Sequence, residues 1–282
     1  MKKKRWLLVV LYLFFSLLCL LVLFPVFYTL SNSFMAPDEI MEHYQAVSTG
    51  NGQASFHFFA QSFSLQAYYR VFLATPNYLL KFWNSLLLCT VIVAGQALVS
   101  VMGGFAFAKY RFPGRRVWFL LIILFMIMPV QVTLLPNYIV LDKLKLLGTY
   151  GALILPAVFL PFGSFLMTLV FRGIPDEMLE AGRLDGAGTL RLLFSVMIPA
   201  SKAGFASLIT LCFIDNWNMV EQPIVFLDSK FRYPLSVFLA SMSNENFALQ
   251  FVCGILSLLP VTLLFFYLKD ELAQGLDLSS SK

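Results

Sequence analysis

The residue types that carry out catalysis are sparse in this chain, and their spacing does not bring them together. The two histidines, His43 and His57, share one polar and aromatic stretch. No third ligand lies at helical or hairpin spacing from them, so no metal site is expected. No Ser, His and Asp set falls within the apolar segments, and the sequence has no GxxxxGK(S/T) phosphate loop. We therefore expect no catalytic residue in this chain and no cofactor bound to it.

The four cysteines lie in apolar runs, far from one another: Cys19, Cys89, Cys212 and Cys253. Because they form no CxxC pair, neither a zinc site nor a disulfide framework is indicated. We expect all four to be small packing residues.

Polar side chains that interrupt an apolar segment are the better functional candidates. Asp215, Asn216, Trp217 and Asn218 fall late in such a segment, and Glu221, Gln222 and Pro223 follow closely. Polar groups are costly inside a membrane and are usually functional there. Either the helix ends near Asp215, or these groups face a wet cavity between subunits. We favour a helix end or bend near the outer side.

A second group of charged residues lies between two apolar segments and reads as a short helix. Pro175 suits the first helical turn, and Asp176, Glu177 and Glu180 favour its positive end. Gly186 and Gly188 then predict an elbow, followed by a second helical stretch over 189–197 that ends at a proline. An amphipathic linker at the membrane surface is the alternative interpretation.

The composition shows which elements must position these residues. Of the 282 residues, 59% are hydrophobic and only 12% are charged, too few charges to cover a water-soluble surface. A soluble enzyme, a disordered scaffold and a nucleic-acid-binding protein are therefore disfavoured, and a lipid bilayer is the expected environment. A helix needs about 20 apolar residues to cross it. The predicted spans are 7–30, 82–108, 117–140, 149–171, 203–226 and 247–268.

The basic residues predict how these spans are oriented. With the N-terminus in the cytoplasm, fourteen of the 20 Lys and Arg residues lie on the inner side, which is the expected bias. An even number of spans returns the C-terminus to the cytoplasm. The first apolar run is too long for a signal peptide and is expected to be an uncleaved helix. We therefore predict a multi-pass protein of the plasma or inner membrane.

Two further patterns concern packing within the spans. Small residues at helical spacing, Ala97, Ser100, Gly104 and Ala108, predict close packing against another helix. Prolines in the third and fourth spans predict bent helices; they are Pro129, Pro136, Pro156 and Pro161.

One string of residues resembles a known motif. Glu180-Ala181-Gly182, followed by Gly186 and by Ile198-Pro199, is similar to the EAA motif of ABC-importer permease subunits. Gly182 departs from the motif's second alanine, which lowers helix propensity by about 1 kcal/mol.

Further similarities follow in the order seen in sugar-importer permeases of the maltose-transporter type, and they cover roughly residues 82–268. They are Asn84-Ser85-Leu86, the run 105–115, Met128-Pro129, Leu135-Pro136 and Trp217-Asn218.

The resemblance implies an all-α membrane protein with six transmembrane helices, the type I ABC importer permease fold and a cytoplasmic coupling helix. It divides the chain into a first helix with an outer loop (1–81), a five-helix core (82–270) and a tail (271–282). The EAA loop lies at 172–202. The implied function is that of a transmembrane permease subunit of a binding-protein-dependent ABC importer, which translocates a sugar or oligosaccharide by alternating access driven by a separate ATPase subunit. A permease for a polyamine, phosphate or amino acid is the first alternative, and a secondary transporter is a weaker one.

The resemblance also implies roles for single residues and a set of partners. Contact with the ATPase is expected from Glu180, Ala181, Gly182, Asp185 and Gly186, and the translocation path is expected to include Asp215, Asn216, Trp217 and Asn218. The expected partners are an ATPase dimer that carries ATP and Mg²⁺, an extracytoplasmic solute-binding protein and a second permease subunit. Two different permease chains are expected, with a homodimer as the alternative.

Overall fold

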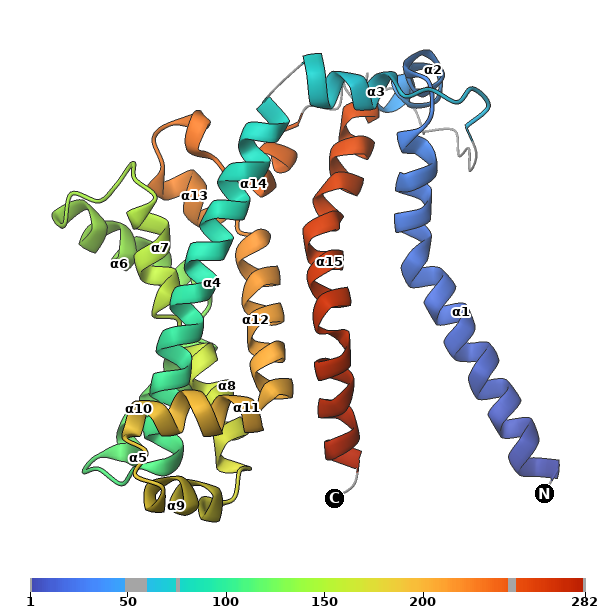
Figure 1. The fold of residues 1–282 in the computed structure, drawn as a ribbon. Helices are drawn as coiled ribbons and strands as arrows, with labels where there is room; N and C mark the ends of the chain where they lie inside the picture. Colours follow the sequence, from blue (N-terminus) through green and yellow to red (C-terminus); the bar gives the residue numbers. More distant parts are fainter. Residues whose placement is uncertain (1, 49–59, 75–76, 243–246, 281–282) are drawn as a thin grey trace. The chain divides into compact units, whose positions relative to one another are not determined.

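The computed structural model describes residues 2–48, 60–74, 77–242 and 247–280, so that His57 lies outside the described residues. Two compact units make up the chain: Met1–Leu80 with Leu239–Leu259, and Lys81–Phe238 with Pro260–Lys282. We refer to them as unit 1 and unit 2. The described residues form helices, shown in Figure 1, and a single antiparallel β-bridge between Met35 and Phe63.

Unit 1 begins with the long helix α1 (Lys2–Ser33). Its apolar stretch, Leu8–Ser33, buries none of its most apolar window inside the chain. A helix that is apolar all round and unburied needs an apolar solvent, as a lipid bilayer provides. The shorter elements that follow are α2 (Pro37–Ser48), α3 (Gln66–Tyr69) and the π-helical turn η1 (Arg70–Ala74).

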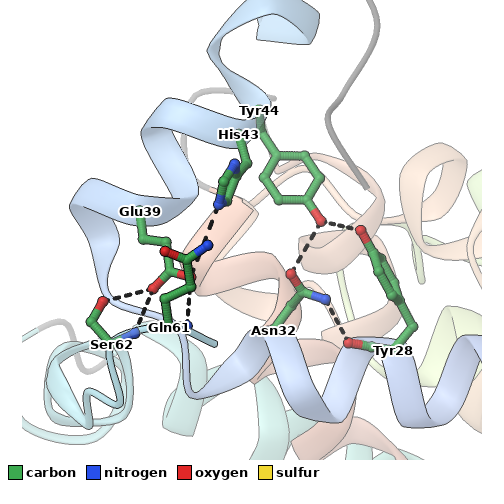
Figure 2. A network of polar contacts seen from close by, with 7 residues as sticks. All are labelled: Tyr28, Asn32, Glu39, His43, Tyr44, Gln61 and Ser62. Atoms are coloured by element: carbon green, nitrogen blue, oxygen red, sulfur yellow. Dashed lines mark hydrogen bonds and ion pairs between the residues drawn. The ribbon is translucent and has the colours of Figure 1, made fainter. Parts of the chain in front are cut away.

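A polar network ties α2 to the chain segment that follows it (Figure 2). Glu39 accepts hydrogen bonds from the backbone N–H of Gln61 at 2.8 Å and of Ser62 at 3.0 Å, and from the Ser62 hydroxyl at 2.6 Å. Burial alone would raise the pKa of the Glu39 carboxyl, but these hydrogen bonds hold the pKa below its ordinary value. The carboxylate therefore fastens α2 to residues 61–62 at neutral pH.

A second part of the network joins α2 to α1 (Figure 2). The Tyr28 and Tyr44 hydroxyls lie 2.5 Å apart, and Tyr44 donates to Asn32 Oδ1 at 3.2 Å. Apolar packing surrounds it, because Met35, Ile40 and Tyr44 form a buried cluster. Unit 1 is thus organised around the C-terminal end of α1.

Unit 2 is built on α4 (Asn77–Lys109), from Lys81 onward. The helices that follow α4 are α5 (Arg115–Ile127), α6 (Val130–Lys143), α7 (Gly151–Val158), α8 (Pro161–Arg172), α9 (Asp176–Leu184), α10 (Thr189–Leu192), π-helical η2 (Leu193–Met197), α11 (Ile198–Ala200), α12 (Lys202–Trp217), α13 (Glu221–Phe226), 3-10 helical η3 (Lys230–Arg232), α14 (Leu235–Ala240) and α15 (Phe247–Ser280). Along α4, helices α6, α7 and α13 gather toward one end, and α9 with α10 lie at the other (Figure 1).

The small-residue stripe of α4 packs against α8, as predicted. A Cβ on Gly104 would lie 2.5 Å from Met167 Cβ and 2.8 Å from the Met167 carbonyl carbon. Ser100 is buried beside Gly163 of α8 in the same way. The two backbones approach too closely for larger side chains, so van der Waals contact joins these helices.

The six predicted spans agree with the structure if two of them are bent helix pairs. Four helices are long and apolar enough to cross a membrane, and the number rises to six when each of two sharply bent pairs counts as one span. The predicted third span is broken into α5 and α6 with a bend of 104°. Pro129 lies at this break and cannot donate the backbone hydrogen bond that would continue the helix. The predicted proline bend is thereby confirmed in this span.

The predicted fifth span ends earlier than residue 226. Helix α12 stops at Trp217, and α13 begins at Glu221 as a separate helix of six residues. Asn218 closes α12, because its backbone N–H and its side-chain amide both donate to Ile214 O, at 3.2 and 2.8 Å. Local side-chain hydrogen bonds of this kind compete with helix propagation.

Candidate functional site

A cavity with several polar lining residues lies between the break at Pro129 and the end of α12 in unit 2. It has a volume of about 410 Å³ and is lined by residues of α6, α7, the end of α12 and α13. A neighbouring cavity of about 600 Å³ shares Val130, Thr133, Asn137, Leu160 and Asp215 with it. Irregular backbone at membrane depth is tolerated where it lines a wet cavity, and discontinuous helices often form transport sites.

The polar lining comes from both sides of the cavity. From α6 come Gln131, Thr133 and Asn137, and from the end of α12 and from α13 come Asn218 and Glu221. Gln131 Nε2 donates to the two carboxylate oxygens of Glu221 at 2.9 and 3.2 Å. This pair joins the broken third span to the chain that follows the fifth.

Asp215 lines both cavities and its carboxylate points to no partner. It forms neither a hydrogen bond nor an ion pair with any residue that the structure describes. Its neighbour Asn216 is 5% exposed and is held instead, donating to Gln96 Oε1 at 3.1 Å and to Cys212 O at 2.7 Å. Gln96 in turn donates to Ala157 O at 2.8 Å. The amides hold α4, α7 and α12 together and leave the acid available.

The charge of the cavity is negative. Among the described residues that line the two cavities, Asp215 and Glu221 carry charge, and no Lys, Arg or His is present. The remaining polar groups are amides and hydroxyls, which donate and accept hydrogen bonds without charge. Such a lining suits a solute rich in hydroxyl groups and opposes an anion.

Three of the four residues predicted for this region meet at the smaller cavity, and one does not. Asp215, Asn216 and Asn218 line it, whereas Trp217 is 5% exposed and packs in the core. The Trp217 ring stacks on Phe213 at 5.5 Å and meets Phe82 edge-on at 5.9 Å.

Sequence reasoning missed the contribution of α6. The pattern that marked Asp215, a polar residue within a predicted span, also occurs in α6. It is found at Gln131, Thr133 and Asn137, which lie near Pro129 and Pro136.

The other predicted group of residues forms α9 and the turn after it. Glu180, Ala181, Asp185 and Gly186 are exposed, and Leu184 is exposed to 89%. Gly186 has φ +78°, a conformation that favours glycine, and a Cβ there would meet nothing within 4 Å. The predicted glycine elbow is therefore present.

Gly182 faces its own chain. A Cβ at this position would lie 2.6 Å from Leu192 Cδ2 of α10, so the glycine lets α9 and α10 pack together. The remaining four residues are left on the outer surface of the pair.

Lys109, the last residue of α4, anchors the start of α9. Its Nζ donates to Ile174 O and to Asp176 Oδ1, both at 2.5 Å. The hydrogen bond from Lys109 and its charge hold the pKa of the Asp176 carboxyl below its ordinary value. Nearby, the Tyr110 and Thr189 hydroxyls lie 3.3 Å apart. The exposed helix is thus fixed directly to one end of the longest helix in unit 2.

A family model described as binding-protein-dependent transport system inner membrane component matches residues 100–277. This chain belongs to that family. It is a permease, the transport subunit of an ABC transporter. Membership also places the protein in a membrane, in agreement with its exposed apolar helices.

Relatives align along most of the permease. The arabinooligosaccharides transport system permease protein AraQ of Halalkalibacterium halodurans is 28% identical over 271 residues, 95% of this chain and 94% of the relative. The sn-glycerol-3-phosphate transport system permease protein UgpE of Brucella abortus is 30% identical over 199 residues, 69% of this chain and 71% of the relative.

The fold also matches a solved structure. A crystal structure of a bacterial ABC transporter involved in the import of the acidic polysaccharide alginate has a TM-score of 0.79 and 23% identity, covering 96% of this chain and 98% of that chain. The expected type I ABC importer permease fold is confirmed by this likeness.

Proposed function

We propose that this permease imports an uncharged sugar or oligosaccharide through a path to which its polar cavity contributes. The observation that carries the proposal is the lining of that cavity, in which amides, hydroxyls and two carboxylates occur without a cation. Carboxylates accept hydrogen bonds from sugar hydroxyls, and amides both donate and accept them. Relatives named for an arabinooligosaccharide and for glycerol-3-phosphate support the broader class.

The charge of the cavity favours the neutral member of that class. A phosphate or uronate placed near Asp215 and Glu221 would meet like charge, which disfavours its entry. The unpartnered carboxylate of Asp215 is available for a hydroxyl of the solute, and the Gln131–Glu221 pair at the mouth of the α6 break offers a second acceptor.

The proposed mechanism is alternating access driven by a separate ATPase dimer, which carries ATP and Mg²⁺. Helix α9 serves as the coupling helix, with Glu180 and Ala181 exposed on it and Asp185 and Gly186 exposed in the turn that follows, and Gly182 lets it pack against α10. Because Lys109 fixes α9 to α4, a push on α9 is passed to the helix on which unit 2 is built.

The proposed assembly contains a second permease chain, different from this one, and an extracytoplasmic solute-binding protein. In the proposed orientation both termini are cytoplasmic and residues 31–81 lie outside, as the distribution of Lys and Arg favours. In this proposal the chain consists of a first helix with an outer loop (1–81), a core (82–270) and a tail (271–282).

A cationic solute such as a polyamine is the second candidate, because the same two carboxylates would attract it. The two candidates differ in what the carboxylates do. For a sugar they accept hydrogen bonds from hydroxyls, so an amide is a partial substitute. For a polyamine the carboxylates neutralise its positive charge, and an uncharged amide cannot substitute for them.

Uptake by cells that carry the complete transporter tests the proposal. Neutral arabinooligosaccharide, an anionic oligosaccharide and a polyamine are offered to Asp215→Asn, Glu221→Gln and the matched control Asp142→Asn, whose residue lies on α6 outside the cavity lining. We expect uptake of the neutral sugar by the wild type, a loss of roughly tenfold in each cavity variant, and no loss in the control. Faster uptake of the anionic sugar, or of the polyamine, by the wild type would contradict the proposal.

A further inference from the structure

Four arginines converge at the end of unit 2 where α9 lies. Arg111 lies in the turn between α4 and α5, Arg115 and Arg116 are the first residues of α5, and Arg172 is the last residue of α8. With Phe112 and Phe119 they line a pocket of about 790 Å³. The bias of inner loops toward basic residues accounts for the presence of arginines. It does not account for the meeting of side chains from two separate segments around one hollow.

No carboxylate balances this charge inside the pocket. No Asp or Glu is among its lining residues, and none of the four guanidinium groups forms an ion pair with a carboxylate within the described part of the chain. The nearby Asp176 is bound by Lys109. Arginine stays protonated in proteins, so four positive charges line one hollow, and only Arg111 also interacts electrostatically with the Asp176 carboxylate.

Two of the guanidinium groups are held in position beforehand. Arg172 lies over the ring of Phe119, 4.7 Å from its centroid, and Phe119 in turn stacks on Phe165 at 5.9 Å. Arg115 Nη1 donates to Tyr110 O at 3.0 Å, which leaves its other N–H groups available. Groups that are ordered before binding lose less entropy when a ligand arrives. The planar fork of arginine matches the oxygens of a phosphate.

The surface next to the pocket indicates the source of the phosphate. Helix α5 starts at Arg115 and continues as a nearly uninterrupted apolar run in which no residue is buried. Val117 and Trp118 are exposed to 61% and 58%, and Leu120 to 54%. Tryptophan is typical of the level of lipid headgroups. A phosphate held by the arginines would therefore have apolar surface beside it on which acyl chains can lie.

We propose that this arginine pocket binds the phosphate of an anionic phospholipid headgroup, with the lipid's acyl chains along α5. Basic pockets between membrane helices are suited to such headgroups. The site lies beside the turn that carries Tyr110 and Lys109, both of which contact the α9–α10 segment. A bound lipid thus stabilises the junction between α4, α5, α8 and α9.

Native mass spectrometry of the purified transporter complex tests the proposal. The complex is stripped of lipid and then offered phosphatidylglycerol, phosphatidylcholine or inorganic phosphate. We expect phosphatidylglycerol to be retained in preference to phosphatidylcholine. The double variant Arg116→Gln/Arg172→Gln should weaken this retention roughly 25-fold, because each of the two charges removed contributes about fivefold. The control Lys202→Gln removes one exposed positive charge outside the pocket and should retain phosphatidylglycerol as the wild type does.

Arg172→Lys keeps the charge but loses the planar fork and the contact with the Phe119 ring, and it serves if the double variant does not assemble. We expect it to bind severalfold less phosphatidylglycerol than the wild type. Unchanged retention in both variants would overturn the proposal. Displacement of the lipid by inorganic phosphate alone would overturn the lipid source. If the variants lose the ATPase subunit but retain lipid as the wild type does, the pocket is a contact with the ATPase. That result would also overturn the lipid proposal.

Discussion

The side chain missing at Gly104 determines how closely α4 and α8 approach each other. A Cβ there would meet the Met167 Cβ, the Met167 carbonyl carbon and the Thr168 backbone nitrogen, at 2.5, 2.8 and 3.0 Å. Backbone atoms cannot rotate away, so even one methyl group must push the two helices apart. Overpacking of this kind costs about 1–3 kcal/mol.

We predict that Gly104→Ala destabilises the permease and that the adjacent Gly103→Ala has a smaller effect. A Cβ on Gly103 would meet the Ser164 hydroxyl at 3.0 Å, and a side-chain hydroxyl can rotate where backbone atoms cannot. Thermal unfolding of the detergent-solubilised complex measures both. Equal melting temperatures for the two variants would show that the helices separate without cost.

Residue spacing explains why three of the four residues at 215–218 reach the cavity and one does not. Successive residues of an α-helix turn by about 100°, so four consecutive side chains cannot share a face. Asp215 and Asn218 lie three residues apart and point to similar sides, and Asn216 lines the edge of the same cavity. Trp217 points into the core, where its ring stacks on Phe213. The sequence therefore predicts the polar segment, and helical geometry determines which of its residues reach the cavity.

At the scale of elements, the attachment of α9 depends on one buried amine. Only 6% of the Lys109 side chain is exposed, whereas 74% of the Asp176 side chain is. Lys109 also satisfies Ile174 O, just before α9 begins. The connection is therefore made by the lysine to both the backbone and the carboxylate of the helix start.

We predict that Asp176→Asn loosens α9 while Glu177→Gln does not. Both residues lie in the first turn of α9, so both changes remove one favourable charge at the helix N-terminus, and only the first removes the partner of Lys109. Hydrogen exchange over 176–184 should become roughly two- to fivefold faster in Asp176→Asn. ATP hydrolysis should also be less tightly linked to uptake. Equal exchange in the two variants would contradict this account of the anchor.

The link between α2 and residues 61–62 should depend on pH. Hydrogen bonds lower the folded-state pKa of Glu39 below 4.5, so the link adds stability above that value and loses it as the pH falls through the lower folded-state pKa. His43 Nε2 lies 3.9 Å from the carboxylate and, when protonated, favours its charged form.

We expect protection of the Gln61 and Ser62 amides, corrected for intrinsic exchange, to persist at neutral pH and to fall only below about pH 4.5. Glu39→Gln should remove this pH dependence, and Glu42→Gln, on the same helix, should keep it. A constant protection across this range in the wild type would show that the carboxylate contributes nothing to the link.

At the scale of the whole molecule, the exposed apolar surface requires a membrane, and the basic residues predict which end faces inward. Two exposed side chains offer accessible positions for labelling. They are Leu184, the last residue of α9, which is 89% exposed, and Phe63 in unit 1, which is 71% exposed. The proposed orientation places Leu184 on the cytoplasmic side of the membrane and Phe63 on the outer side.

We predict that Leu184→Cys reacts with a membrane-impermeant thiol reagent only after the cells are permeabilised, and that Phe63→Cys reacts in intact cells. Both variants are made in a background in which the four native cysteines are replaced, which removes the exposed Cys19. Labelling of Leu184→Cys in intact cells would reverse the proposed orientation.

The sequence by itself determined the class of the protein and the two segments where function is expected. Hydropathy and the rarity of charge suffice to predict membrane helices, because burying backbone polar groups in lipid leaves few alternatives to a helix. The loop 172–202 was predicted as two short helices around a glycine elbow, and α9, Gly186 and α10 confirm that pattern.

Only the tertiary structure shows which residues of distant segments lie next to one another. The breaks at Pro129 and Asn218 lie far apart along the chain, yet they bring Gln131 of α6 against Glu221 of α13. The same holds for Arg172 of α8, which lines one pocket with Arg111 before α5 and with Arg115 and Arg116 at its start. Such pairings depend on how bent helices pack, because periodicity specifies the face of a helix and not the neighbour that this face will meet.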